Sequence, residues 1–427
     1  MKYTKYEIGP YNIHIIKTNK FKTVNIRTIF KRKTLKDEIT KRNMLSDILL
    51  RSSKKYPTER SIAIECEELY DLYINSNITL SGLYNLLIFD IAFLNSKYTE
   101  DNIADKSIEF LSEILFNPNV ENNEFNKETF EISKTYIGDI IDSLDENTNR
   151  YSNIRMLEEM DKDAVYAIRA DGYKDDLEKI TSSDLYNYYL SVLKSDNVDI
   201  FVVGNVDENS IKDSITKYFK INTIKKQMGT HYINHNKYRK RSKTVTEKKD
   251  INQSRLVMGY KLLNLDNFET NYVSTIYSLI LGGGVDSNLF KTVREKNSLC
   301  YSISSNIYKV SNIMFITAGI NASKFKKTVN LIKKEVKNMN NGKFSDEDIN
   351  KAKCIYKNSC EELMDSPIDI INVYSSSVYL GTDLLDDRIK KIDNVTKEMI
   401  IEFSKKIKLD TVYLLEGGSE DEDNTNE

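Results

Sequence analysis

The chain has 427 residues, of which 62 are Lys or Arg and 64 are Asp or Glu, so its formal net charge at pH 7 is −2. This balance excludes a strongly basic nucleic-acid-binding protein. The longest apolar runs are far shorter than the ~20 residues that cross a bilayer, so we expect no membrane span. The length suits two to four domains of roughly 100–200 residues each.

In chain order, short apolar runs alternate with helical patterns. In the first half, strands are predicted at residues 11–17, 23–30, 74–80, 84–93 and 198–203, and helices at residues 40–51, 61–72, 101–115, 124–143 and 184–193. In the second half, strands are predicted at residues 255–261, 301–309, 313–320 and 411–415, and helices at residues 271–281, 324–339 and 346–364. Neighbouring strands resemble hairpins with helices gathered between them, which favours an α+β fold over a parallel βαβ series.

Two parts of the chain follow the same plan about half a chain apart. Thr181 and Thr396 each suit a helix N-cap. Each is followed by a helical pattern and then by a strand closed by Gly, and the two Thr residues are 396 − 181 = 215 residues apart. Residues 110–136 and 331–356 form a second pair of similar segments at a comparable offset. Generic helix–strand units are the alternative, but the agreement in order and spacing favours duplication. We therefore predict two homologous mixed or antiparallel sheet domains in tandem, each covered by helices.

The predicted boundaries follow from composition. An N-terminal half spans residues 1–216, a basic linker 217–249, a C-terminal half 250–418, and an acidic tail 419–427. The linker has basic clusters and few apolar anchors, so it is typical of a solvated connector. Contact with phosphate is the less favoured alternative, because no aromatic-rich face accompanies the basic run. The tail composition is typical of disorder.

The four cysteines lack CxxC spacing, and the N-terminus has no apolar signal core. Both features predict a cytoplasmic protein with reduced thiols. Only three histidines occur. His14 falls in a predicted strand and is expected to be structural. His231 and His235 are spaced i, i+4, which on a helix would allow a shared metal, but they lie in the basic connector without a third ligand.

Familiar catalytic motifs are missing from the sequence, which contains no GxxxxGK[ST], GxSxG or HExxH. The triple glycine at residues 282–284 follows a predicted helix and lacks the strand-before, helix-after context of a dinucleotide loop. We expect it to permit close backbone approach or to act as a hinge.

One segment carries a specific pattern. Residues 289–301 fit Leu-Phe-x-x-x-Arg-Glu-x-x-x-Leu-x-Tyr, with Arg294 and Tyr301 seven residues apart. This stretch resembles the second half of the insulinase/pitrilysin-like zinc peptidases, the family with the inverted HxxEH motif. The resemblance extends from about residue 8 to 417 and implies a mitochondrial-processing-peptidase-like metallohydrolase fold. It also implies that Arg294 and Tyr301 face a bound peptide.

The first half departs from the family pattern at the metal site. The positions that match HxxEH are occupied by Asn43, Ser46 and Asp47, and the position of the third ligand falls near Thr135. Zinc requires imidazole, thiolate or carboxylate ligands, and hydrolysis needs a base for the bound water. We therefore expect no metal on this chain and no peptidase activity from the chain alone.

Two functions remain open at this point. The first is the zinc-free subunit of a two-chain peptidase, of the type that the resemblance points to in Firmicutes. Its HxxEH partner would hold the zinc, and a peptide substrate would pair with a sheet edge, for which residues 74–80 are a candidate. The resemblance leaves open a role in elongation factor P modification or in bacteriocin peptide maturation. The alternative is a non-catalytic scaffold or chaperone-like protein.

Overall fold

The computed structural model describes residues 1–223 and 226–417 and divides into two compact units. Unit 1 contains the described residues of 1–143, 169–231 and 364–379. Unit 2 contains residues 144–168, 232–363 and the described residues from 380 onward. The units therefore differ from the two sequence halves, because each half contributes one segment to the unit built mainly by the other.

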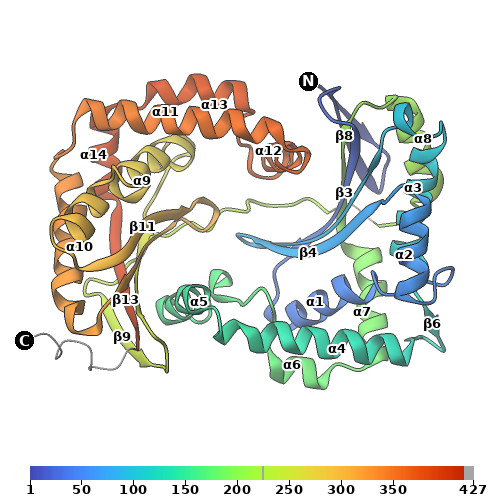
Figure 1. Ribbon diagram of the computed structural model, residues 1–427, viewed down its shortest axis with the longest axis horizontal. Helices are drawn as coiled ribbons and strands as arrows, with labels where there is room; N and C mark the ends of the chain where they lie inside the picture. The colour runs from blue at the N-terminus through green and yellow to red at the C-terminus, as the bar shows by residue number, and fades with distance from the viewer. Residues whose placement is uncertain (224–225, 418–427) are drawn as a thin grey trace, which may run out of the picture. The chain divides into compact units, whose positions relative to one another are not determined.

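Unit 1 is built on a six-stranded sheet whose strand order is β1-β2-β8-β3-β5-β4 (Figure 1). The strands are β1 (Lys2–Glu7), β2 (Tyr11–Lys17), β3 (Thr23–Lys33), β4 (Tyr73–Ser81), β5 (Tyr84–Leu94) and β8 (Asn197–Gly204). Strands β2 and β8 are parallel, and the other neighbours are antiparallel. Strand β4 lies at one edge, and it is the strand predicted at residues 74–80.

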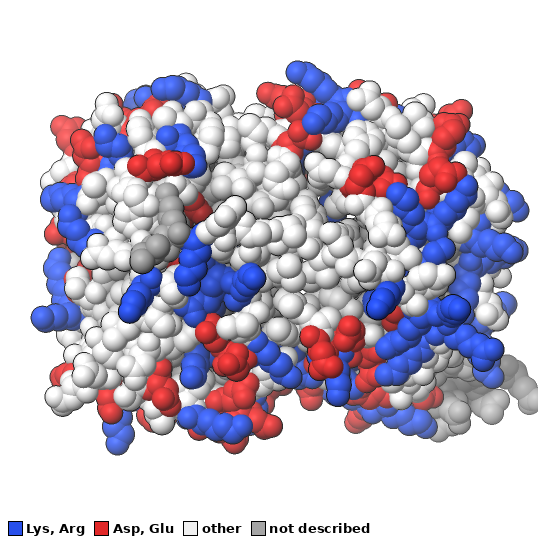
Figure 2. All heavy atoms as spheres, turned by 180° about the vertical axis from the view of Figure 1, so that it is seen from behind, with Lys and Arg blue, Asp and Glu red and all other residues white. Residues whose placement is uncertain are grey.

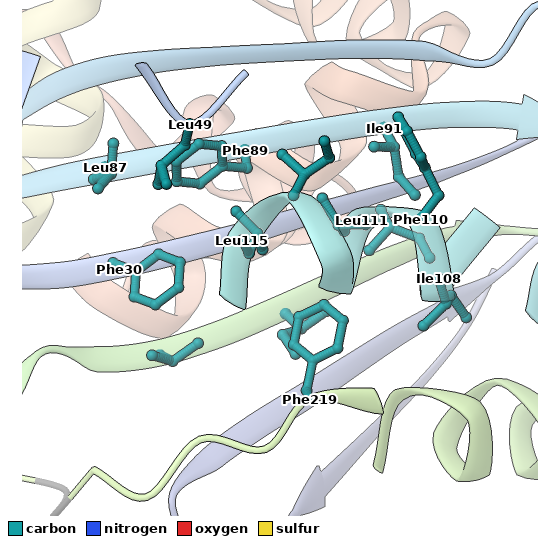
Figure 3. Close-up of a cluster of buried hydrophobic side chains, with 14 of the residues drawn as sticks. Phe30, Leu49, Leu87, Phe89, Ile91, Ile108, Phe110, Leu111, Leu115 and Phe219 are labelled. Atoms are coloured by element: carbon teal, nitrogen blue, oxygen red, sulfur yellow. The ribbon is translucent and has the colours of Figure 1, made fainter. Parts of the chain in front are cut away.

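Helices cover one face of this sheet and form the main core of unit 1. They are α1 (Ile39–Ile48), α2 (Glu59–Glu68), α3 (Ile103–Phe116), α4 (Lys127–Asp142), α6 (Lys174–Lys179), α7 (Ser182–Ser195) and α8 (Glu208–Tyr218), and a short hairpin joins β6 (Val120–Glu121) to β7 (Glu124–Phe125). Figure 3 shows Leu111 and Leu115 of α3 in the same apolar cluster as Phe89 and Ile91 of β5. Burial of each such side chain stabilises the folded state by about 1.5–3 kcal/mol.

The opposite face of the same sheet packs against α12 (Pro367–Leu380), which belongs to the second half of the chain. Phe201 and Val203 of β8 contact Ile370 and Ile371 of α12, whereas the alternate residues of β8 point into the main core. Because successive side chains of a strand point to opposite faces, both faces of this sheet are buried.

Unit 2 repeats this plan with five strands in the order β11-β12-β10-β13-β9. The strands are β9 (Lys243–Lys248), β10 (Ser254–Leu262), β11 (Cys300–Tyr308), β12 (Ile313–Ile320) and β13 (Ile407–Glu416). The helices are α5 (Thr148–Met160), the π-helix η5 (Glu269–Val273), α9 (Ser274–Gly282), the π-helix η6 (Phe290–Glu295), α10 (Phe325–Asn340), α11 (Asp346–Glu362), α13 (Leu385–Lys391) and α14 (Lys397–Lys405).

Helix α5 comes from the first half of the chain and covers a face of the unit 2 sheet. Its Met156 and Met160 pack with Val257, Phe315 and Tyr413. The alternate residues of these strands belong to the larger core with α9, α10 and α14. The two halves have thus exchanged one helix each, α5 for α12.

The two predicted caps, at Thr181 and Thr396, are confirmed, and a further cap lies at Ser345. The Thr181 hydroxyl accepts a hydrogen bond from the backbone N–H of Asp184, and Thr396 accepts one from Met399. Ser345 and Asp348 form a capping box at the start of α11. These bonds satisfy backbone donors that the first helical turn leaves unpaired.

Residues 217–249, predicted as a solvated linker, contain regular structure. Helix α8 extends to Tyr218, and β9 pairs in parallel with β13. The prediction failed for β9 because its Lys, Thr and Glu residues resemble a polar connector. Its pairing depends on β13, which lies 411 − 243 = 168 residues further along the chain. The predicted tail at 419–427 lies outside the described residues.

Two surface properties relate to the composition. No helix in the described part of the chain is long and apolar enough to cross a membrane. Figure 2 shows acidic and basic side chains interspersed on the visible face, as expected from the balanced charge.

Candidate functional site

Arg294 lies in the last turn of the π-helix η6. Its side chain is exposed, with Cζ 4.6 Å from the centre of the Phe290 ring, and it forms no ion pair with a described residue. The ring restrains the guanidinium by a cation–π contact and leaves its hydrogen-bond donors available. Arg294 is therefore a positioned cation with free donors.

A tight turn carries the chain from η6 into β11. Ser298 has a left-handed φ of 45°, its backbone N–H donates to Arg294 O at 3.0 Å, and the N–H of Leu299 donates to Val293 O at 3.1 Å. The Asn297 amide donates to Thr292 O at 2.8 Å. These bonds fix where β11 begins relative to Arg294.

Tyr301 is the extra residue of a β-bulge. Cys300 pairs with Ile320 and Ser302 pairs with Gly319, so Tyr301 has no partner on β12, and 72% of it is exposed. Bulges bend a strand and redirect one side chain, and they are common beside active sites. Tyr301 thus stands out from an edge strand of the unit 2 sheet.

The two residues lie at the same end of β11. Burial raises the pKa of the Cys300 thiol to about 11, and the Arg294 guanidinium acts in the opposite direction, which places its charge near the residue preceding Tyr301. The triple glycine supports this end of the unit. A Cβ on Gly282 would lie 2.6 Å from the backbone nitrogen of Ser305, so the predicted close approach occurs there, between α9 and β11.

The positions that match HxxEH lie on α1 in unit 1, and hydrogen bonds occupy each side chain. The Asn43 amide donates to Ala170 O, and the Ser46 hydroxyl donates to Asn43 O at 2.7 Å. Both Asp47 oxygens accept from Arg51, at 2.5 and 3.0 Å. A zinc ion needs several anionic or imidazole donors with free lone pairs, so these three residues do not fit one.

Thr135, at the predicted position of the third ligand, is exposed on α4, and its hydroxyl donates to Glu131 O at 2.9 Å. Its neighbour Tyr136 is the side chain that reaches toward α1, with its ring 5.1 Å from Cζ of Arg51. Across residues 1–223 and 226–417, no group of three His, Cys, Asp or Glu side chains is arranged to hold a metal ion.

The histidines have other partners. The His14 ring bonds Tyr3 OH at 2.8 Å through Nδ1 and Asp199 at 3.2 Å through Nε2. His231 and His235 are not on a helix, and they belong to different units. Their i, i+4 spacing therefore does not place the two rings on one helix face, as a shared metal would require. Their surroundings were not foreseen, because the residues that contact them come from distant parts of the chain.

The structure contains two sheet units that share one strand plan. The family model described as "Peptidase M16 inactive domain" matches residues 179–356. The chain is 32% identical over 417 residues to "Probable inactive metalloprotease YmfF" of Bacillus subtilis, a match that covers 97% of each chain. It is also 27% identical over 254 residues to "Uncharacterized zinc protease YmxG" of the same organism, covering 54% of this chain and 56% of the relative.

Solved structures agree with this match. A conserved protein from Enterococcus faecalis superposes with a TM-score of 0.92 at 25% identity, covering 98% of this chain and all of that one. The M16 inactive domain from Pseudomonas fluorescens superposes with a TM-score of 0.79 at 14% identity, covering 98% and 99%. The chain belongs to the M16 peptidase family, and the predicted α+β fold of insulinase-like type is confirmed.

Proposed function

We propose that this chain is the zinc-free subunit of a two-chain peptidase and that it contributes Arg294 and Tyr301 to peptide binding. The observation that carries the proposal is the contrast between the two sets of residues. Arg294 and Tyr301 are exposed and held by a turn and a bulge, whereas Asn43, Ser46 and Asp47 are engaged in hydrogen bonds within the fold. A homologous HxxEH subunit would supply the zinc.

The chemistry of the pair suits a peptide. A guanidinium and a phenol each donate hydrogen bonds to a carbonyl oxygen, and such bonds strengthen as negative charge develops on that oxygen. Strand β4, at the edge of the unit 1 sheet, has a free edge to which an extended peptide would add as a further strand. Cleavage itself is then the partner's reaction, because Asn43, Ser46 and Asp47 stand where HxxEH has its two histidines and its glutamate base.

The relatives support the coarser part of the proposal. The Bacillus subtilis relative, matched over nearly its whole length, is named a probable inactive metalloprotease.

The four cysteines of the chain are free thiols. Free thiols are the usual state in a reducing compartment, so we place the pair in the cytoplasm.

The decisive experiment mixes the purified chain with an HxxEH homologue from the same genome and follows cleavage of a peptide library. Arg294→Ala is expected to abolish cleavage, and Tyr301→Phe to reduce it. Lys296→Ala, which removes an exposed charge two residues away, is the matched control and should cleave normally. Full cleavage with Arg294→Ala would remove the proposal.

Metal analysis of the co-purified complex separates the two chains' roles. Zinc is expected to remain with the HxxEH subunit when the chains are separated. Near-stoichiometric zinc on this chain alone would show that the alignment of Asn43, Ser46 and Asp47 with HxxEH is wrong.

A second candidate function is a non-catalytic scaffold or chaperone-like clamp. The hydrogen bonds that occupy the side chains at the HxxEH positions favour it equally. In that case Arg294 would be dispensable, and the chain would retain an unfolded client without any HxxEH protein. Retention of a client by both wild type and Arg294→Ala, together with no cleavage in any mixture, would favour the scaffold.

A further inference from the structure

Each unit contains a Lys–Asp pair at equivalent strand positions. In unit 1, Lys31 on β3 lies two residues beyond Ile29, the strand partner of Asp199 on the neighbouring β8, and both charged residues are buried. In unit 2, Lys261 on β10 lies 3.5 Å from Asp410 on the neighbouring β13. Strands β3 and β8 occupy the same places in the first sheet as β10 and β13 in the second.

The exchanged segments add a tyrosine to each pair. The Tyr379 hydroxyl, near the end of α12, donates to Asp199 at 2.9 Å, and Lys31 Nζ lies 3.6 Å from the centre of its ring. Tyr166 follows α5, and burial together with the Asp161 and Asp410 carboxylates raises its pKa. Each unit therefore contains a cluster of one Lys, one Asp and one Tyr, and the Tyr comes from the exchanged segment.

The connector, residues 226–242, adds one histidine to each cluster. The His231 ring stacks on Tyr379 with 5.6 Å between ring centres, and only 2% of the residue is exposed. His231 Nδ1 bonds Ser81 Oγ at 3.1 Å, whereas Nε2 has no hydrogen-bond partner among the described residues. His235 lies beside Tyr166, with 5.8 Å between ring centres, and its Nε2 bonds Ser311 O at 2.8 Å.

Backbone bonds flank both histidines. The N–H of Leu83 donates to His231 O at 3.0 Å in unit 1, and the N–H of Ile233 donates to Val310 O at 2.8 Å in unit 2. The connector is therefore attached to each unit by a buried ring and a backbone hydrogen bond.

We propose that the connector is a strap that each unit holds through one neutral histidine seated in its Lys–Asp–Tyr cluster, and that protonation of His231 releases the strap from unit 1. The groups that face His231 are Lys31 from β3, Ser81 at the end of β4, Tyr84 from β5 and Tyr379 from α12. None of these four carries a negative charge at neutral pH, and the acid of the cluster, Asp199, is hydrogen-bonded to Tyr379, His14 and Asn12. A protonated ring would therefore carry a second cation next to Lys31 and a donor on Nε2 without an acceptor.

The direction of the pH dependence follows from this environment. Burial, with the charge of Lys31, lowers the pKa of His231 to about 4 from an ordinary 6.5. Because the docked ring binds its proton less readily than the free ring, docking is complete above pH 6.5 and weakens as the pH falls toward 4. At pH 5 the docking equilibrium should be about 30-fold less favourable than at pH 7.5.

His235 has a different environment. Burial lowers its pKa, but the Asp410 and Asp161 carboxylates oppose that change while Lys261 reinforces it. Nearby carboxylates make a charged His235 less unfavourable than a charged His231, so we assign the acid-sensitive attachment to unit 1.

Hydrogen exchange of the full chain at pH 7.5 and 5.0, corrected for the intrinsic pH dependence, tests the proposal. The connector and Leu83 should exchange about 30-fold faster relative to the intrinsic rate at pH 5.0, while α3 stays protected. His231→Phe keeps an aromatic ring that cannot be protonated, so it should remove the response, and His235→Phe should leave it in place at Leu83. Equal protection of wild type at both pH values, or loss of α3 protection together with the connector, would overturn the proposal. A response that persists in His231→Phe would do the same.

Discussion

The two units of this protein share one strand plan but attach their exchanged helices differently. Helix α12 is held on the unit 1 sheet by a buried charge pair, in which Arg27 bonds both oxygens of Asp90 at 2.7 and 2.9 Å and Asn372 of α12 at 2.6 Å. Helix α5 is held on the unit 2 sheet by the partly exposed Arg155, which pairs with Glu247 of β9 and also with Glu158 and Glu159 of α5 itself. Duplicated sequences can thus keep a topology while the polar contacts diverge.

The units also differ at the edges and at the candidate sites. Strand β1 covers β2 in unit 1, whereas β9, the equivalent of β2, is an edge strand in unit 2. Unit 1 contains Asn43, Ser46 and Asp47, and unit 2 contains the exposed Arg294 and Tyr301. Under the proposed function, the peptide-binding pair and the positions aligned with HxxEH therefore belong to different units.

The largest expected effect tests how α12 is held. Arg27→Met leaves Asp90 buried without its cation and should lower the free energy of unfolding by about 3–5 kcal/mol in urea denaturation. Arg155→Met in unit 2 should cost only about 1 kcal/mol, because its partners are partly exposed. The double variant Arg27→Met/Asp90→Leu should recover most of the loss. Equal costs for the two single variants would contradict the difference between the units.

A smaller effect is expected at the close approach of α9 to β11. Gly282→Ala places a Cβ 2.6 Å from the backbone nitrogen of Ser305. It should therefore lower the free energy of unfolding by about 2 kcal/mol, despite the better helix propensity of Ala. Gly138→Ala on α4 in unit 1 is the matched control, because its Cβ would lie 3.6 Å from Leu177 Cδ2. That variant should be stabilised by about 0.5–1 kcal/mol. A stabilised Gly282→Ala protein would show that β11 moves to make room.

The charge cluster in unit 1 predicts a pH-dependent stability. Burial lowers the pKa of Lys31 to about 8, against the attraction of Asp199. The folded state then loses this proton at a lower pH than the unfolded state does, so stability rises between pH 8 and 10.5. From pH 7.5 to 9.5 wild type should gain about 2 kcal/mol relative to Lys31→Met. Lys31→Arg, which stays charged over this range, provides the control, and parallel pH profiles for wild type and Lys31→Met would rule out the effect.

The smallest effect concerns the stability of the candidate peptide-binding pair. Arg294→Ala and Tyr301→Phe should each change the free energy of unfolding by less than about 0.5 kcal/mol, since both side chains are exposed. Thermal unfolding of the purified chain measures this. A loss above 1 kcal/mol would mean that the pair supports the fold, and that any loss of cleavage by these variants has a structural cause.

Much of the fold could be predicted because local patterns encode it. The strands predicted at 11–17 and 313–320 match β2 and β12 residue for residue, and the caps predicted at Thr181 and Thr396 mark true helix starts. The exchanged helices α5 and α12 were not predicted. Each is placed by a sheet whose strands lie far away in the sequence, so no local pattern shows which face it covers.

The candidate site could be predicted only in part. Arg294 and Tyr301 stand out through their spacing, but the bulge that exposes Tyr301 depends on pairing between β11 and β12. The bonds that engage Asn43 and Asp47 depend on the tertiary position of Ala170 and on the local turn that brings Arg51 back to α1.

By itself, the sequence determined the α+β plan and the family, and it predicted the absence of the HxxEH ligands, because periodicity, caps and motif residues are local properties. The tertiary structure decided which helix covers which sheet and which charges are buried together, because those choices depend on strands and helices that lie far apart in the sequence. It also turned a polar connector into a segment with one buried histidine in each unit.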